Sequence, residues 1–254
     1  MISDSSSFDL HEKRIVITGA SSGIGAAIAR LLAEHGAVIG IHYHRHVNEA
    51  QLLIDQIRST GGKAEGFQVD LTDFEERKRL IPFMLDKLGG LDGFVNNAGA
   101  PQGQHSFPEI TQSEWDQTLA LNVEAPFFLA QQAFAHMKSN DGGRIINISS
   151  IGVKYGGSAR TLHYAMAKSA LETLTIGMAK LGAPFNVLVN TVRVGVIDTP
   201  FWKNKTEEEF KNRIKLIPLG RSGKSQDVAE MIHFLLTPQS SFITGQIFTV
   251  SGGE

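Results

Sequence analysis

A glycine-rich stretch near the start of the chain constrains the fold more than any other feature. It follows the apolar run Arg14–Ile17, precedes a helical pattern that reaches His35, and consists of Thr18, Gly19, Ala20, Ser21, Ser22, Gly23, Ile24 and Gly25. Gly19 permits a tight turn, whereas Gly23 and Gly25 permit close backbone approach and close packing of a helix on a strand. A strand, such a turn and a helix N-terminus present N–H groups and a positive dipole to a pyrophosphate. The stretch therefore predicts a βα unit that binds a dinucleotide, although an ordinary glycine-rich loop would look the same in isolation.

Strand-like apolar runs alternate with helical patterns through most of the chain, which predicts βα units and a parallel sheet. Several runs are continuously apolar, as expected when helices cover both faces of the sheet. The expected strands are residues 14–17, 38–43, 64–69, 93–96, 144–148, 186–192 and 246–250. The expected helices are residues 23–35, 47–60, 73–88, 112–138, 162–182 and 225–236. We therefore predict an α/β fold, a Rossmann-like, doubly wound parallel sheet of about seven strands in three α/β/α layers.

Bulk properties narrow the class of protein. The 254 residues contain no cysteine and have a formal charge of −2, with acidic and basic residues interspersed. These features predict one domain over residues 1–254, without a disulfide framework or a nucleic-acid partner. With no membrane-length apolar run and no signal-peptide pattern, we expect a cytoplasmic protein with no membrane partner. Residues 201–221 break the strand–helix rhythm after a strand end, which predicts a substrate lid near 200–221.

Two further polar segments follow expected strands, and both belong at the same sheet edge as the glycine turn. Asp70 and Leu71 follow the third strand, where the Asp70 carboxylate is placed to accept from an adenine amino group. Asn97, Ala98 and Gly99 follow the fourth strand. Turn residues are common at such positions, so each segment by itself is also explained as a polar turn. Together with the glycine turn they predict a cofactor site.

The end of the second expected strand bears on which cofactor binds. An NAD-selective site usually ends this strand with an acid, but here His44, Arg45 and His46 occur and the first acid is Glu49. Arg45 is suited to a 2′-phosphate, so we predict NADP, with NAD possible. His42, His44 and His46 alternate and would share one face of a regular strand, which raises a metal chelate as an alternative. No carboxylate near in sequence is expected to support such ligands by hydrogen bonds, and edge and loop histidines explain the pattern, so we predict no metal site.

The expected reacting groups are a phenol and an ammonium one helical turn apart. Tyr164 and Lys168 share a helix face, and Lys168 has the sign and distance to stabilise a phenolate. An isolated tyrosine has a pKa near 10, so we expect Lys168 and a nicotinamide charge to lower the Tyr164 pKa toward 7. Ser149 and Ser150 end the fifth expected strand, and either hydroxyl is placed to bind a substrate oxygen.

Taken together, these residues resemble the short-chain dehydrogenase/reductase family from about His11 to Gly253. The resemblance also rests on Asn122 within Leu-Asn-Val and on late motifs at residues 218–221, 227–229, 243–245 and 252–253. It implies that Tyr164 is the general acid/base, Ser150 orients the carbonyl, and Lys168 binds the nicotinamide ribose and lowers the tyrosine pKa. It further implies that Asn122 supports a water chain for proton supply and that Ile197 and Thr199 hold the nicotinamide carboxamide.

This chain departs from the family pattern at three places. Val194, before Gly195 in the loop expected to contact the cofactor, replaces the usual proline, and Ser251 replaces a common aspartate. The interval from Ser150 to Tyr164 is about one residue longer than the family pattern, which keeps Ser149 as the lesser candidate for the serine role. The turn at His44, Arg45 and His46 is similar to the NADP-binding turn of pteridine reductases.

The resulting hypothesis is an enzyme that transfers a hydride between NADPH and a small-molecule carbonyl or alcohol. One alternative is a 3-oxoacyl-(acyl carrier protein) reductase. An acidic carrier should need basic residues at the cleft rim, and the turns at 140–143 and 182–185 contain none. A dinucleotide-sensing regulator is an alternative of another class, which loss of Tyr164 or Lys168 would favour. Apolar residues around the expected helices 112–138 and 162–182 predict a homo-oligomer, and the resemblance implies a homotetramer.

Overall fold

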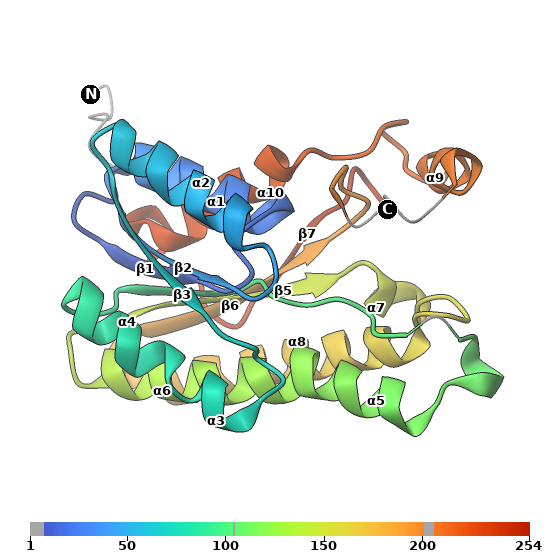
Figure 1. The fold of residues 1–254 in the computed structure, drawn as a ribbon, viewed down its shortest axis with the longest axis horizontal. Helices are drawn as coiled ribbons and strands as arrows, with labels where there is room; N and C mark the ends of the chain where they lie inside the picture. The colour runs from blue at the N-terminus through green and yellow to red at the C-terminus, as the bar shows by residue number, and fades with distance from the viewer. Residues whose placement is uncertain (1–7, 104, 201–205) are drawn as a thin grey trace.

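The computed structural model describes residues 8–103, 105–200 and 206–254, and they fold around one parallel sheet (Figure 1). The strand order is β3-β2-β1-β4-β5-β6-β7, and every neighbouring pair is parallel. The chain therefore winds outward from β1 in both directions, so the strand order reverses between β1 and β4. The strands are β1 (Arg14–Ile17), β2 (Val38–Tyr43), β3 (Lys63–Gln68), β4 (Gly93–Asn96), β5 (Gly143–Ser150), β6 (Val187–Val194) and β7 (Ile247–Val250).

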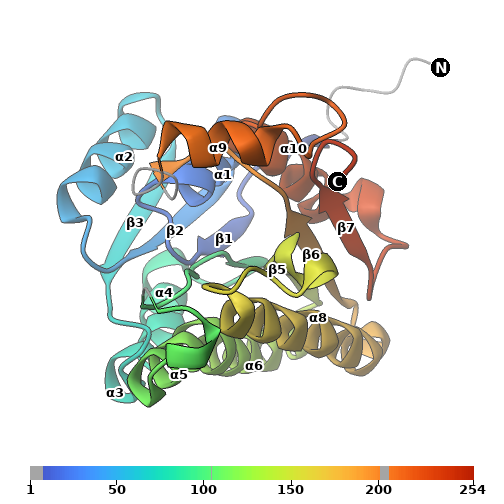
Figure 2. The same cartoon turned by 90° about the vertical axis from the view of Figure 1, so that its right-hand side faces the viewer.

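Helices cover both faces of the sheet, which confirms the predicted doubly wound α/β fold. Helices α1, α2 and α10 lie on one face, and α4, α6 and α8 lie on the other (Figures 1 and 2). The helices are α1 (Gly23–Glu34), α2 (Val47–Ser59), α3 (Phe74–Arg77), α4 (Leu80–Leu88), α5 (Gln112–Leu119), α6 (Ala125–Lys138), α7 (Gly152–Tyr155), α8 (Leu162–Gly182), α9 (Glu207–Ile214) and α10 (Ser225–Leu236). Within the described ranges, no helix has the length and hydropathy needed to span a membrane.

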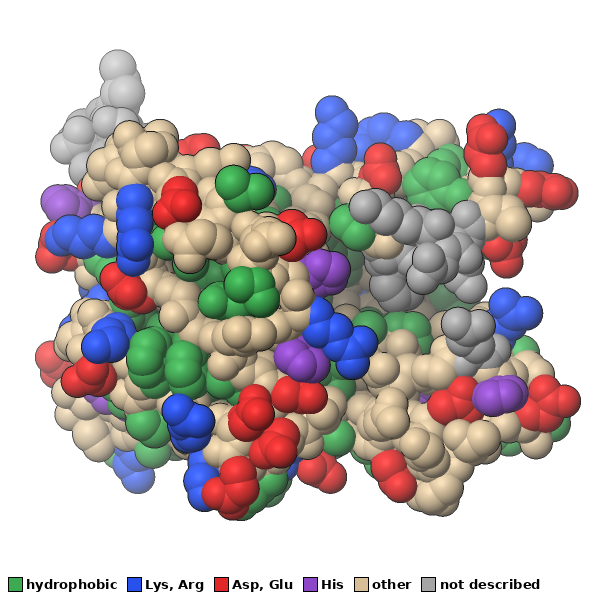
Figure 3. All heavy atoms as spheres, viewed as in Figure 1, with side chains coloured by type: hydrophobic (Ala, Val, Ile, Leu, Met, Phe, Trp, Pro, Cys, Tyr) green, Lys and Arg blue, Asp and Glu red, His purple; other side chains and the backbone are tan. Residues whose placement is uncertain are grey.

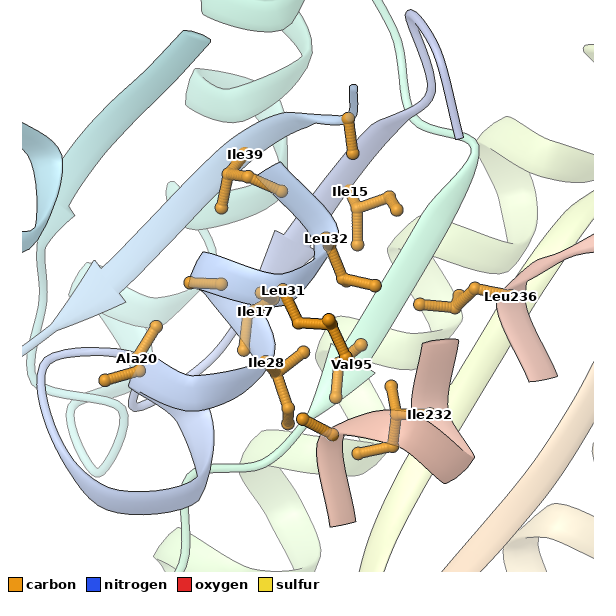
Figure 4. Close-up of a cluster of buried hydrophobic side chains, with 14 of the residues drawn as sticks. Ile15, Ile17, Ala20, Ile28, Leu31, Leu32, Ile39, Val95, Ile232 and Leu236 are labelled. Atoms are coloured by element: carbon orange, nitrogen blue, oxygen red, sulfur yellow. The ribbon is translucent and has the colours of Figure 1, made fainter. Parts of the chain in front are cut away.

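The core consists of one apolar cluster on each face of the sheet. On the α1 face, Ile28 and Leu32 point between the strands and α10, where Ile15 and Ile232 meet them (Figure 4). Each of these four side chains is fully buried, and burying one contributes about 1.5–3 kcal/mol. The two clusters hold the strands rigidly, so their carboxyl ends form a fixed platform for polar side chains.

The helix predicted over residues 73–88 is wrong in detail, because it is interrupted between α3 and α4. Asp73 caps α3 by accepting a hydrogen bond from the N–H of Glu76 at 2.9 Å. Pro82 lies in the first turn of α4, where a missing N–H costs nothing, whereas in the interior of one long helix it would remove a hydrogen bond. The chain therefore ends one helix and begins another.

The helix predicted over residues 112–138 is interrupted too, by a π-helical turn at Ala120–Glu124 between α5 and α6. Pro126 follows this turn as the second residue of α6. In a regular α-helix the Pro126 ring would clash with the carbonyl group four residues earlier, which belongs to Asn122. The wider turn accommodates the ring and places Asn122 on the inner side of the helix, with its side chain fully buried.

The structure also corrects the placement of two turns. Residues 140–143 and 182–185 precede β5 and β6, so in this parallel sheet they lie at the amino-terminal edge. They contact each other there, since Gly143 N–H donates to Asn186 O at 3.1 Å. The expectation that these turns form a cleft rim at the carboxyl edge is therefore wrong. Their lack of arginine says nothing about a carrier protein at that edge.

Two segments near the carboxyl edge were not predicted as helices. One is the short α7, directly after β5, and the other is α9, which lies within the expected lid segment. Thr206 begins α9 with a capping box, in which it accepts from Glu209 N–H and Glu209 accepts from Thr206 N–H. Residues 201–205 of the expected lid lie outside the described residues.

Candidate active site

The glycine turn after β1 adopts a conformation that larger residues disfavour. Gly19 and Gly23 have φ of 63° and 55°, in the left-handed region. A Cβ on Gly25 would lie 2.4 Å from Gly19 O and 2.6 Å from Asn97 Nδ2, distances that no side chain tolerates. The bare backbone therefore lets α1 begin directly against the turn.

Thr18 and Asn97 tie the glycine turn to the end of β4. The Thr18 hydroxyl oxygen accepts from the N–H groups of Asn97 and Ala98, each at 3.0 Å. The Asn97 side-chain amide donates to Thr18 O at 2.8 Å and to Gly19 O at 3.1 Å. Asn97 thus fixes the predicted cofactor turn by binding the backbone carbonyl groups of that turn. Ala98 packs on Gly19, and its Cα lies 3.0 Å from where a Gly19 Cβ would be.

The N-terminus of α1 fits an anionic group. Ser22 is the residue before the helix, and its side chain makes no capping hydrogen bond, whereas Ser21 and Ile24 lie partly buried beside it. Thr199 closes the other side, with Cβ 3.6 Å from the position of a Gly23 Cβ. An uncapped helix N-terminus with a glycine turn is the backbone arrangement that binds phosphate.

The segment that carries Thr199 leaves the sheet in an extended conformation. Val194 keeps an N–H, unlike proline, and β6 continues through it in register with Ser150 of β5. Gly195 donates its N–H to Val250 O at 2.9 Å, and a Cβ there would lie 2.7 Å from the Ser251 backbone. Ile197 is buried and pairs with Gly223 in an isolated parallel bridge. These contacts fix the loop without the family's usual proline.

The ends of β2 and β3 bring the predicted nucleotide-binding residues together. His44 Nε2 lies 3.6 Å from Asp70 Oδ2, and Arg45 and His46 are exposed beside them. Burial raises the pKa of Asp70, but hydrogen bonds from Thr72 and the charges of His44 and Arg45 outweigh it and lower the pKa overall. Leu71 differs from Asp70, because its side chain is buried in the core on the α4 face.

His42 occupies a different environment from His44 and His46. Its Nδ1 accepts from Gly19 N–H, and its Nε2 pairs with Val69 O, each at 3.0 Å. With both ring nitrogens bonded to backbone, His42 is not available as a ligand, and the chelate of three histidines considered from the sequence is wrong. Among the residues that the structure describes, no group of three potential ligands gathers for a metal ion.

Lys168 and Tyr164 lie on the face of α8 that meets the ends of β4 and β5. Lys168 is 2% exposed, and its Nζ donates to Ile148 O at 2.9 Å and lies 5.6 Å from the Tyr164 ring centroid. A Cβ on Gly99 would lie 2.7 Å from this Nζ. Gly99 therefore lets the backbone pass close to the ammonium, which has three protons and donates one of them to Ile148 O.

Burial shifts the pKa of both groups. It lowers the pKa of Lys168 to about 8. It raises the pKa of Tyr164 above its usual value, which contradicts the expected shift toward 7. The reason is desolvation, because the surroundings of the ring disfavour a charged phenolate. Tyr164 is therefore protonated at neutral pH and has a proton to donate.

Asn122 also lies against Gly99, beside the Lys168 ammonium. Its Nδ2 donates to Ala100 O and Thr118 O, each at 2.9 Å. Its Oδ1 is buried without a hydrogen-bond partner among the described residues, and lies 2.6 Å from the position of a Gly99 Cβ. A buried acceptor needs a donor, so Asn122 Oδ1 is suited to accept a hydrogen bond from a water or a ribose hydroxyl.

The two serines at the end of β5 have separate environments. Ser149 is buried, and its hydroxyl donates to Glu172 Oε1 at 2.7 Å. Ser150 is partly exposed, and its Oγ accepts from Gly152 N–H at 3.2 Å. This acceptance leaves the Ser150 proton to donate elsewhere.

Comparison with known proteins agrees with this geometry. A family model described as enoyl-(acyl carrier protein) reductase matches residues 19–254. The short-chain dehydrogenase/reductase FrzI of Cladobotryum sp is 35% identical over 252 residues, with 96% of each chain covered. The chain belongs to the short-chain dehydrogenase/reductase family. As a member of this family it is an NAD(P)-dependent oxidoreductase that acts on carbonyl or alcohol groups.

Other short-chain dehydrogenases/reductases and their structures are similar over nearly the whole chain. The 3-oxoacyl-[acyl-carrier-protein] reductase FabG of Thermotoga maritima is 32% identical over 244 residues, covering 96% of this chain and 98% of FabG. A blue fluorescent protein from a metagenomic library, in complex with NADPH, is 35% identical with a TM-score of 0.91, covering 96% and 98%. A short-chain dehydrogenase from Burkholderia cenocepacia, in complex with NADP, is 33% identical with a TM-score of 0.89 and the same coverage.

The sequence did not predict the residues that support this short-chain dehydrogenase/reductase site by hydrogen bonds to its neighbours. Glu172 accepts two hydrogen bonds from Arg193, at 2.9 and 2.6 Å, besides the one from Ser149. His163 Nε2 bonds Gln102 O at 3.1 Å and fixes the backbone that follows Gly99. Glu172 and Arg193 have opposite charges, but they come from distant parts of the sequence, and only the packing of α8 on β6 brings them together.

Proposed function

We propose that this short-chain dehydrogenase/reductase uses NADPH to reduce a small-molecule carbonyl, with Tyr164 as the proton donor. The observation that carries the proposal is the arrangement around Gly99. There the buried Lys168 Nζ and the unpartnered Asn122 Oδ1 lie 2.7 and 2.6 Å from the position of a Gly99 Cβ, and Lys168 Nζ lies 5.6 Å from the Tyr164 ring centroid. The glycine turn opens at the same sheet edge, next to the β1–β4 reversal where such folds bind dinucleotides.

Each residue has a role that follows from its surroundings. When bound, NADPH supplies the hydride. Tyr164, which burial keeps protonated, donates its O–H proton to the carbonyl oxygen as the hydride arrives at carbon. Ser150 donates its hydroxyl proton to the same oxygen and so orients and polarises the carbonyl, because its own Oγ already accepts from Gly152. Ser149, whose hydroxyl is committed to Glu172, does not fit this role.

Lys168 and Asn122 support Tyr164. Lys168 has protons left to bind ribose hydroxyls, and its positive charge stabilises the negative charge that develops on the phenolic oxygen as its proton leaves. Asn122 Oδ1 accepts from a water that resupplies the tyrosine proton. Ile197 and Thr199 are placed on the loop beside Gly23 to hold the carboxamide end. Val194 and Gly195 position that loop.

The preference for NADPH rests on the β2 and β3 ends. His44, Arg45 and His46 follow the end of β2 and would hold a 2′-phosphate, and the His44 ring lies 3.6 Å from Asp70, in the segment after β3. Arg45 is exposed, so its guanidinium is able to bind a phosphate through charge-assisted hydrogen bonds. The NADPH and NADP complexes of the two structural relatives support the same choice.

The experiment that tests this proposal titrates the protein with NADPH and NADH and then screens carbonyl compounds for loss of nicotinamide absorbance. We expect NADPH to bind more tightly and at least one carbonyl to be reduced. Arg45→Ala should weaken NADPH binding by about tenfold or more, since a charge-assisted pair contributes roughly 1.5–3 kcal/mol, and should leave NADH binding unchanged. Binding without turnover across a wide panel would instead favour a dinucleotide sensor.

A second candidate is reduction of 3-oxoacyl groups on acyl carrier protein. FabG of Thermotoga maritima carries this activity in its name and is 32% identical. Arg160, directly before α8, is an exposed basic residue near the carboxyl edge, where a carrier would dock. Including a 3-oxoacyl thioester in the panel, free and on carrier protein, separates this candidate from small carbonyl compounds.

We also propose that α9 belongs to a substrate lid and that the protein is a homotetramer. Residue 206 begins α9 close after the Thr199 loop, and Arg213 of α9 pairs with Glu254. On α6 and α8, the side chains of Phe127 and Ile176 are 43% and 42% exposed. Apolar side chains left open on the outer layer favour association with further copies.

A further inference from the structure

His42 is a buried polar side chain that the proposed chemistry does not use. It lies in β2, is 3% exposed, and is the last inward-facing residue before the nucleotide-binding turn. The sequence pattern singled it out together with His44 and His46, but the structure separates it from both. Its position next to the glycine turn raises the question of what it holds.

His42 contacts the first two N–H groups of the glycine turn. Gly19 N–H donates to the ring Nδ1 at 3.0 Å, and Ala20 N–H donates to the His42 carbonyl oxygen at 2.9 Å. The ring Nε2 faces Val69 O at 3.0 Å. Since Val69 O is only an acceptor, Nε2 carries the proton and Nδ1 is the acceptor, so the ring is a neutral bridge between three strand ends.

The bridge requires an uncharged ring. Protonated His42 would have N–H at both nitrogens, and Nδ1 would then face the Gly19 N–H as donor against donor. The charged groups that act on His42 among the described residues are His44, which opposes its protonation, and Asp70, which favours it. Burial outweighs Asp70 and lowers the pKa of His42 to about 4, so the bridge is neutral at physiological pH.

The bridge also decides which N–H groups remain for a ligand. The N–H of Gly19 and that of Ala20 point to His42, away from the N-terminus of α1. A pyrophosphate is then left with the N–H groups from Ser21 to Ile24, where the turn enters the helix. If the Gly19 peptide lost its partner, it would be free to rotate, and the glycine conformation at φ 63° would no longer be fixed.

We propose that His42 is a positioning residue for the cofactor, which holds the glycine turn in the conformation that receives the pyrophosphate. This inference rests on the proposed binding of a dinucleotide at the turn. It places no part of His42 on the cofactor and assigns it no role in the hydride or proton step. The pyrophosphate is common to NADPH and NADH, so His42 should affect both alike, in contrast to Arg45.

The test compares His42→Phe, His42→Asn and His42→Gln in fluorescence titrations with NADPH and with NADH. Asn places an acceptor near the Nδ1 position and restores the partner of Gly19, whereas Phe removes both bonds and Gln reaches toward Val69 only. We expect His42→Phe to raise the Kd for both cofactors tenfold or more and His42→Asn to stay within about threefold. At saturating NADPH, kcat and the carbonyl KM should not change.

Ile39→Ala is the matched control, since Ile39 is a fully buried residue of the same strand and packs in the core. It should lower Tm but leave the Kd for NADPH as it is. The inference would be overturned if all His42 variants bound NADPH as tightly as the unsubstituted protein. It would also be overturned if Ile39→Ala raised the Kd for NADPH as much as His42→Phe does. If His42→Phe fails to fold, the comparison of His42→Asn with His42→Gln decides. Tighter NADPH binding by His42→Asn supports the inference, and tighter NADPH binding by His42→Gln contradicts it. Failure of the unsubstituted protein to bind NADPH or NADH would instead refute the proposed function.

Discussion

Tyr164 combines a raised pKa with a position one helical turn before Lys168, and these two properties make the removal of its hydroxyl a direct test. Tyr164→Phe removes only the hydroxyl, so the ring packing on Lys168 stays. We expect carbonyl reduction to fall by about 10²- to 10⁴-fold, the range that a positioned general acid contributes. The measurement is kcat for NADPH oxidation with a carbonyl substrate, together with the Kd for NADPH, which should change little.

The control for Tyr164 is Tyr155→Phe, because Tyr155 lies in α7 and is 56% exposed. This variant should reduce the carbonyl at nearly the normal rate. If Tyr164→Phe kept full turnover, tyrosine would not be the proton donor, and the assignment of the site would fail with it.

His42 predicts how stability depends on pH. Its pKa is near 6.5 in an unfolded chain and about 4 in the folded protein, because burial disfavours the charged ring. The unfolded chain therefore binds more protons between these values, so stability is complete above pH 6.5 and falls as pH drops toward 4. From pH 7 to pH 5 this group alone should lower the free energy of unfolding by about 2 kcal/mol.

Urea unfolding at pH 7 and pH 5 measures this loss, and comparison with His42→Asn isolates it from other titrating groups. The Asn variant should lose about 2 kcal/mol less than the unsubstituted protein between the two pH values. His11→Asn, a change at an exposed histidine, should follow the unsubstituted protein. An identical pH dependence in His42→Asn would show that His42 is not a buried neutral ring.

At the scale of single residues, sequence reasoning found the groups that project into the site and missed those that bond behind it. Tyr164, Lys168 and Gly99 carry motif spacing, so their positions were predictable. Ser150 was preferred to Ser149 through the family resemblance alone, because the sequence does not show that Glu172 binds the Ser149 hydroxyl. His42 was grouped with His44 and His46, since nothing in the sequence shows that Gly19 N–H points toward it.

Among the helices and strands, the boundaries predicted from periodicity held where the pattern was uninterrupted. The bounds of α8, α10 and three strands (β1, β2 and β4) match the expected residues, because buried apolar runs end in clear turn signals. The two expected helices that proved interrupted contain Pro82 and Pro126. Both prolines were visible, but whether a proline ends a helix, kinks it or adds a π turn depends on the neighbouring packing. Asn122 lies in such a turn, so its buried position was predictable only through the family resemblance.

The junction of α8, β5 and β6 gives a prediction for these elements. Glu172 accepts two hydrogen bonds from Arg193 and one from Ser149, and its side chain is 9% exposed. Glu172 lies one turn after Lys168, so this group of three fixes the register of α8 on the sheet. Glu172→Ala leaves the Arg193 charge without its partner and should destabilise the protein by about 3–5 kcal/mol.

A double-mutant cycle with Arg193→Ala tests the coupling. Glu172→Ala and Arg193→Ala each leave one charge without its partner. The double variant should therefore be more stable, by about 1–3 kcal/mol, than the sum of the two single losses predicts. Urea unfolding of the four proteins gives these values. Additive losses would mean that the two side chains are not coupled and that α8 is held by its apolar face alone.

In the whole molecule, the polar residues of the candidate site lie at the carboxyl edge of the sheet, whereas large apolar side chains are exposed on α6 and α8. Parallel strands bring the glycine turn, Gly99, Ser150 and Asp70 to the same edge, although they are far apart in sequence. Charges of both signs are interspersed over the face in Figure 3, so no strongly basic surface stands out on it. The strand order was not stated from sequence, but alternating elements and right-handed crossovers left few alternatives to it.

The exposed apolar side chains on α6 and α8 predict the assembly. Phe127 and Ile176 are 43% and 42% exposed, and burying large apolar side chains between copies gains about 1.5–3 kcal/mol each. We expect light scattering after gel filtration to give the mass of a tetramer for the unsubstituted protein and a smaller mass for Phe127→Asp or Ile176→Asp. Leu52→Asp is the control, because Leu52 lies on α2, on the other face of the sheet, and is 61% exposed. A monomer at micromolar concentration, or equal dissociation of Leu52→Asp, would show that this surface does not hold copies together.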